Sequence, residues 1–105
     1  MEFSEYHRWW KHQGGQELRR LLMERWDPIG VKDAPEAAGE YDGYRGDLIR
    51  LLRDDASARE IAEYLAGAEY KRMGIGSGDP NLNMPVAEEI VRWYPDSLAR
   101  WEAAH

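Results

Sequence analysis

The chain has 105 residues, a formal net charge of −6 and no cysteine. This length fits a single domain, and the absence of cysteine excludes disulfides and thiolate chemistry. No apolar run reaches the ~18 residues that a membrane span needs. Residues 1–13 also lack the apolar segment of a secretory signal, so we expect a cytoplasmic protein.

The acidic excess is confined to the middle third of the chain. Residues 33–69 carry ten acids and four arginines, whereas residues 1–32 carry five acids and six bases, and residues 70–105 five acids and four bases. A protein that binds nucleic acid directly carries the opposite sign. The distribution therefore excludes that class and favours a basic protein as partner.

Two segments with helical periodicity are predicted at the N-terminus. Within residues 2–12, the spacing of the aromatic residues places Phe3, Tyr6, Trp9 and Trp10 on one face. Gly14-Gly15 is expected to break the helix, so residues 1–15 are interpreted as an accessory N-terminal helix of the single domain 1–105. A second helix is predicted over residues 16–25 and ends before Asp27-Pro28, because a residue that precedes proline avoids the α conformation.

A long connection follows over residues 26–40. Trp26 is expected to be buried at its start, Gly30 to form a turn, and Pro35-Glu36 to open one helical turn that ends at Gly39. A connection of this length in so small a protein is unlike a passive linker. We expect it to be structured.

Three further helices are predicted. The first spans about residues 41–54, and the second begins at a capping box formed by Ser57 and Glu60 and ends near Arg72, before Gly74. Asn83 is expected to cap the third, which Pro95 ends or kinks before a short tail helix that starts at Asp96 or Ser97. No segment alternates as a strand does. We therefore predict an all-α fold, a compact bundle of four to five short helices with a long structured connection.

One set of motifs resembles a known family. Residues 26–31 read WDPIGV, residues 35–37 PEA and residues 40–44 EYDGY. This W-D-P-I-G…P-E-A…E-Y-D-x-Y pattern resembles a family of small all-helical bacterial proteins that has no established activity. The similarity covers about residues 17–94 and leaves out residues 1–15 and the tail. It implies an all-helical fold.

No catalytic, cofactor or metal site is predicted. His7 and His12 are five apart and diverge on a helix, so they do not present the i,i+4 face that a metal needs. Asp27, Glu36, Glu40 and Asp42 lack the spacing of a calcium loop, and the GIGSGDP segment lacks the strand and lysine of a phosphate-binding loop. We therefore expect a protein that is not an enzyme, although a small hydrolase that uses Asp or Glu with a metal is a third interpretation.

The function that the sequence favours is a small acidic module that binds a basic protein. By analogy with other small acidic helical proteins, the hypothesis is an immunity or antitoxin protein that neutralises a basic partner such as a nuclease toxin. The alternative is a self-associating helical protein, a homodimer, with a structural or regulatory role. The predicted partner-binding residues are Glu40, Asp42, Asp47, Asp54, Asp55 and Glu63.

Overall fold

A computed structural model describes residues 1–28 and 41–105. The elements are α1 (Phe3–Trp9), the π-helical turn η1 (Trp10–Gly14), α2 (Gly15–Leu21), the π turn η2 (Leu22–Trp26), α3 (Asp42–Arg53), α4 (Ala58–Gly67), the π turn η4 (Ala68–Arg72), the 3₁₀ turn η5 (Pro80–Asn83) and α5 (Met84–Ala104). Within these two ranges the chain is helical and has no strand. The predicted all-α bundle is confirmed. The turns predicted at Gly30 and over 35–39 lie outside the described residues.

The predicted helix break at Gly14-Gly15 is wrong. The helix runs from Phe3 to Trp26 without interruption, and widens to a π turn at residues 10–14. A β-carbon on Gly14 would lie 2.5 Å from the Trp9 ring, and one on Gly15 would lie 2.9 Å from the Trp10 carbonyl and 3.0 Å from the Arg45 guanidinium. Both glycines therefore allow neighbouring side-chain and carbonyl groups to approach the backbone closely, and neither changes the direction of the chain.

The two middle helices follow the sequence closely. α3 spans Asp42–Arg53, within the predicted 41–54. At the start of α4 the capping box is complete, because the Glu60 amide donates to Ser57 Oγ at 3.2 Å and the Ser57 amide donates to Glu60 Oε1 at 3.1 Å. The helix ends after η4, where Gly74 has the left-handed φ of 69° expected of a C-terminal glycine.

The last helix differs from the prediction at both ends. Asn83 precedes α5, yet its side chain makes no capping bond and instead donates to Glu69 Oε2 at 2.6 Å. Pro95 does not end the helix, which continues to Ala104, so no separate tail helix begins at Asp96 or Ser97. Burial of Ser97 and Trp101 beyond the proline holds this final part against the rest of the molecule.

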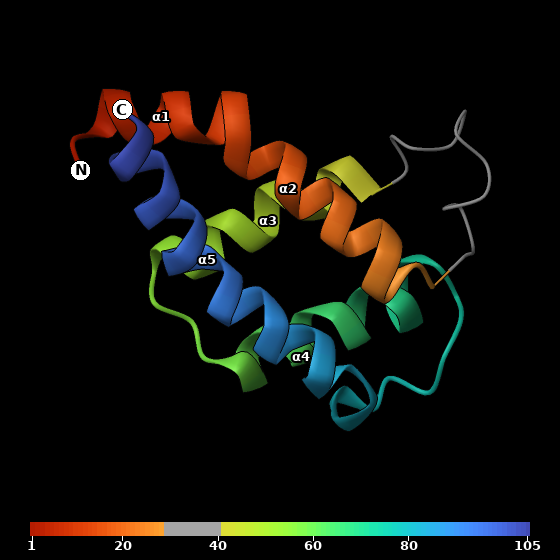
Figure 1. The fold of residues 1–105 in the computed structure, drawn as a ribbon. Coiled ribbons are helices and arrows are strands. Elements are labelled where there is room, and N and C mark those ends of the chain that lie inside the picture. Colours follow the sequence, from red (N-terminus) through yellow and green to blue (C-terminus); the bar gives the residue numbers. More distant parts are fainter. Residues whose placement is uncertain (29–40) are drawn as a thin grey trace.

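The helices enclose one core. α4 packs on α5 and η5, α2 packs on α3, and η1 packs on α5. In Figure 1 the long first helix and α5 lie in front of α3 and α4, and the two termini are close together. The fully buried hydrophobic side chains of the central cluster are Leu18, Leu22, Tyr41, Leu48, Ile61, Ala62, Leu65, Ala87 and Ile90.

The N-terminal aromatic residues pack on α5. Trp9 is fully buried, with its ring centroid 6.0 Å from that of Trp93 and 5.8 Å from that of Tyr94. The Tyr6 hydroxyl lies 2.8 Å from that of Tyr94. Phe3 is 78% exposed and does not join them. Most of the predicted aromatic face is thus part of the domain.

Trp26 is buried at the end of the first helix, as predicted, with 9% of its surface exposed. Its ring lies 5.3 Å from Tyr41 and 5.6 Å from Tyr44. Asp27 adopts a left-handed conformation, and the Tyr41 hydroxyl donates to Asp27 Oδ1 at 2.9 Å. This hydrogen bond joins the residues on either side of segment 29–40.

Candidate protein-binding surface

The six predicted contact residues fall into three groups. Glu40 lies outside the described residues. Asp42 and Asp47 are bound to neighbouring helices by ion pairs. Asp54, Asp55 and Glu63 are exposed to solvent. Only the last group keeps the geometry of a free contact surface.

Asp42 joins α3 to the first helix. Its carboxylate accepts two hydrogen bonds from Arg19, at 3.0 Å from Nε and 2.5 Å from the terminal nitrogen. Arg45 Nε lies 3.3 Å from Asp42 Oδ1. A bidentate arginine pair of this kind fixes the relative position of two helices. Asp42 therefore stabilises the fold.

Asp47, one of the predicted contact residues, joins α3 to α4. The Tyr64 hydroxyl donates to Asp47 Oδ2 at 2.5 Å, Arg72 lies 3.3 Å from the same oxygen, and Arg50 binds Oδ1. The hydrogen bond from Tyr64 and the nearby arginines hold the pKa of Asp47 below its usual value. Burial and this same hydrogen bond raise the pKa of Tyr64 well above its ordinary value. At neutral pH the pair is therefore a carboxylate that accepts from a neutral phenol.

Arg72 is the centre of this arrangement. Its guanidinium carbon lies 5.6 Å from the Tyr44 ring centroid and 5.8 Å from that of Tyr64, within the range of a cation–π contact. We call Tyr44, Asp47, Tyr64 and Arg72 the α3–α4 clasp. Sequence reasoning missed it because its members come from α3, α4 and η4, and no local spacing relates the residues of α3 to Tyr64 and Arg72.

Asp54 and Asp55 lie where α3 ends and Glu63 lies within α4, and we call these three exposed acids the acidic corner. Asp54 follows the last residue of α3, and Asp55 has a left-handed φ of 65°. In the part of the chain that the structure describes, neither makes an ion pair, and Glu63 has only a distant one, 3.9 Å from Arg59. These carboxylates are accessible to another molecule.

Two shallow hollows lie on either side of Tyr64, beside the acidic corner. One, of about 300 Å³, is lined by Asp47, Arg50, Leu51, Asp54 and Tyr64. The other, of about 200 Å³, is lined by Glu63, Tyr64, Gly67, Ala68, Lys71 and Arg72. Both mix acidic and basic groups, with small apolar surfaces between them. Shallow hollows of this kind are better suited to binding another protein than to binding a small molecule, because a small molecule needs an enclosed and mostly apolar cavity.

A second polar network was not predicted and lies between the first helix and α5. Ser97, fully buried, donates to Glu17 Oε1 at 2.7 Å and accepts from Trp9 Nε1 at 3.0 Å. Glu17 also accepts from Trp93 Nε1 and from two nitrogens of Arg100. The Arg100 contacts lower the pKa of Glu17 to about 2. The sequence predicted Ser97 only as a possible start of a tail helix, and not as a member of a buried network.

Comparisons with protein-family models, with curated proteins and with solved structures find no match to this chain. The family resemblance of residues 17–94 stays a prediction. Within residues 1–28 and 41–105, no three metal-binding side chains converge as a metal ion would require. No helix in the same ranges is long and apolar enough to pass through a bilayer.

Proposed function

We propose that this protein is a small protein-binding module whose acidic corner contacts a basic protein. The supporting observation is the position of Asp54 and Asp55 at the C-terminal end of α3, exposed and without an ion pair among the described residues. The C-terminus of a helix carries partial negative charge, so acids there disfavour folding by roughly 0.3–1 kcal/mol each. Residues that lower stability without local compensation are typical of functional surfaces.

The kind of partner follows from the same charges. A partner with exposed arginines or lysines is attracted over a distance comparable to the Debye length, about 8–10 Å at physiological salt. This attraction raises its rate of association and excludes acidic competitors. The proposed biological role is that of an immunity or antitoxin protein that holds a basic toxin, such as a nuclease, by direct binding.

The test begins with the basic proteins encoded beside this gene. Association rates should be measured by stopped-flow fluorescence at several salt concentrations, with the tryptophans as reporters. We expect one of these proteins to bind quickly, with a rate that falls steeply as salt increases. If none binds, or if the rate is independent of salt, the proposal is wrong.

The surface itself is tested by charge reversal. Asp54→Lys with Glu63→Lys should slow association by at least tenfold and flatten its salt dependence. Asp55 should be changed to asparagine rather than lysine, because asparagine tolerates its left-handed backbone. Asp47 is left intact because its reversal would break the α3–α4 clasp.

A matched control uses Glu88→Lys with Glu102→Lys. Both are exposed and have no hydrogen bond or ion pair within the described ranges, and the double change alters net charge by the same amount. An equal slowing by this control would show that total charge, and not the acidic corner, governs binding.

A further inference from the structure

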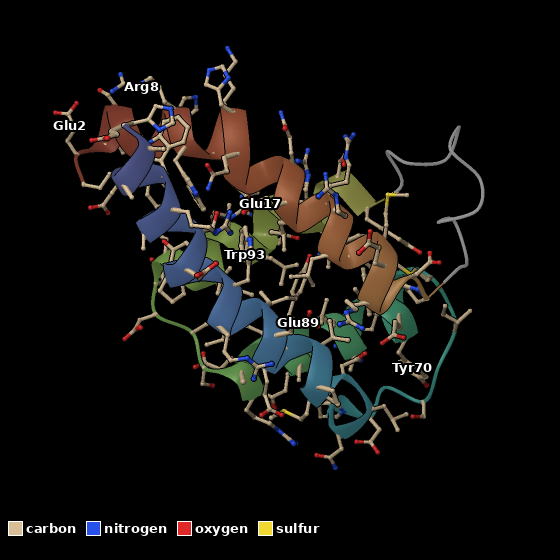
Figure 2. All side chains as sticks on the ribbon, in the orientation of Figure 1. Glu2, Arg8, Glu17, Tyr70, Glu89 and Trp93 are labelled. Atoms are coloured by element: carbon tan, nitrogen blue, oxygen red, sulfur yellow. The ribbon has the colours of Figure 1, made fainter. Side chains whose placement is uncertain are left out.

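A groove runs between α2 and α5 on a face distinct from the acidic corner. It consists of two hollows of about 320 and 490 Å³, and Leu21 and Glu89 line both. Figure 2 shows Glu17, Trp93 and Glu89 one after another along the boundary between the two helices. Leu21 and Trp93 are half-buried and supply apolar surface.

The two helices that form the groove are antiparallel. Glu17, near the start of α2, binds Arg100, near the end of α5, at 2.7 Å. Arg25 in η2 binds Glu89, near the start of α5, at 3.3 Å. The first helix and α5 therefore run in opposite directions along the groove. These two ion pairs therefore determine which side chains of the two helices lie opposite one another along the groove.

Both helices present the same pattern of side chains. Glu17, Arg20, Leu21 and Glu24 on one helix have the spacing of Glu89, Arg92, Trp93 and Asp96 on the other. Residues at these intervals share one face of a helix. Each helix therefore shows an acid, a base, an apolar residue and an acid in the same order.

The exposed charges of this pattern stand at four corners. Along the groove, α2 presents Arg20 and η2 then presents Glu24, whereas antiparallel α5 presents Asp96 and then Arg92 in the same direction. Positive and negative corners therefore alternate around the apolar surface. Arg20, Glu24 and Arg92 have no ion pair in the described part of the chain, and Asp96 pairs only with Arg100.

An alternating square of charges is complementary to itself. When a second copy is turned over about a two-fold axis along the groove, its Arg20 meets Asp96 and its Arg92 meets Glu24. An axis across the groove gives four opposite-charge contacts as well. A uniformly basic or uniformly acidic partner would meet two like charges in either orientation, which is unfavourable.

We propose that the α2–α5 face binds a second copy of this chain and forms a two-fold symmetric dimer. Such an interface is isologous, so each contact occurs twice. Leu21 and Trp93 provide its apolar centre, and the four charged corners provide its polar rim, the usual arrangement of a protein interface. It uses none of the residues proposed to contact the basic partner.

The test measures self-association by sedimentation equilibrium at low salt. The parent protein should show a reversible monomer–dimer equilibrium. The double variant Arg20→Glu/Arg92→Glu makes all four corners negative, and Glu24→Lys/Asp96→Lys makes all four positive. Each variant alone should dimerise at least tenfold more weakly than the parent, with an unchanged circular dichroism spectrum.

The decisive measurement is a mixture of the two variants. Every corner of one then faces an opposite charge on the other, so an equimolar mixture should restore a dimer that contains one copy of each. As controls, Arg8→Glu/Lys11→Glu and Glu88→Lys/Glu102→Lys change the net charge equally with exposed residues outside the groove, and both should dimerise as the parent does. A parent that stays monomeric at millimolar concentration, variants that dimerise as the parent does, or a mixture of monomers would each overturn the proposal.

Discussion

Trp9 and Ser97 are 88 positions apart, and the indole Nε1 of the first donates to Oγ of the second at 3.0 Å within the protein interior. Gln13 Nε2 donates to the same oxygen at 3.1 Å. A hydrogen bond in a low-dielectric interior is costly to leave unmade. The N-terminal segment is therefore held on α5 by polar contacts as well as by aromatic packing.

This relationship predicts different costs for two similar substitutions. Trp9→Phe and Trp26→Phe remove the same volume from buried sites, but Trp9 Nε1 has a hydrogen-bond partner and Trp26 Nε1 has none among the described residues. We expect Trp9→Phe to lower the free energy of unfolding by about 1–2 kcal/mol more than Trp26→Phe. Urea unfolding measures both, and equal losses would show that the hydrogen bond contributes nothing.

The glycines of the long helix predict a second contrast. A β-carbon on Gly14 would overlap the Trp9 ring, whereas one on Gly46, inside α3, meets no atom within 4 Å in the part of the chain that the structure describes. We expect Gly14→Ala to destabilise by about 1–3 kcal/mol through overpacking. Gly46→Ala should stabilise by about 0.5–1 kcal/mol because alanine favours the helix. Thermal unfolding of both variants is the measurement, and stabilisation by Gly14→Ala would contradict the packing.

Glu17 predicts a loss of stability in acid. Its pKa falls from 4.5 to about 2 on folding, chiefly through hydrogen bonds from Arg100. A carboxyl group with a lowered folded-state pKa stabilises the protein above its unfolded pKa and loses that effect as pH falls through the folded pKa. Because the group is partly solvated, we expect a loss of about 1–2 kcal/mol between pH 5 and pH 2.

The variant Glu17→Gln should flatten this part of the stability profile. Glu88→Gln is the control, because Glu88 is exposed and has no hydrogen bond or ion pair among the described residues. Parallel profiles for the parent and Glu17→Gln would mean that the acid sensitivity arises elsewhere.

The α3–α4 clasp predicts a change in the titration of Asp47. The hydrogen bond from Tyr64 is the main cause of its lowered pKa. Tyr64→Phe should therefore raise the pKa of Asp47, as followed by NMR of the carboxyl carbon, whereas Tyr70→Phe, at an exposed tyrosine, should leave it unchanged. An unaltered Asp47 titration in Tyr64→Phe would show that the arginines alone hold the carboxylate.

Local signals in the sequence predicted local structure well. The capping box of Ser57 and Glu60 joins residues three apart, and the left-handed Gly74 follows its helix directly, so both depend on neighbours in the chain. The helix break predicted at Gly14 is absent, and the helix does not end at Pro95, for the opposite reason. Their effect on a helix depends on Trp9 and Arg45 packing beside the glycines and on residues buried beyond the proline.

In the candidate site, too, features that depend on nearby residues were predicted and those that depend on distant contacts were not. Asp54 and Glu63, two of the predicted contact residues, are exposed. Asp47, also a predicted contact residue, lies three residues after Tyr44 and four before Leu51, beside the apolar side of α3. Helical periodicity could not predict that η4 would bring Arg72 over the same surface. A helical pattern identifies the face of a helix that points away from the hydrophobic core. It does not identify the side chains of another helix that pack on that face.

The π turn at Trp10–Gly14 sets the rotational phase of the N-terminal segment. Each residue of an α-helix turns about 100°, so the nine steps from Trp9 to Leu18 would place these side chains on opposite sides. Both are fully buried. The wider turn between them reduces that rotation and brings Trp9 towards α5. Deleting one residue from this turn would leave eight regular steps, about 800°, so the two side chains would stay about 80° apart and Trp9 would keep roughly the same side of the helix. The π turn therefore accommodates one extra residue while Trp9 stays packed on α5.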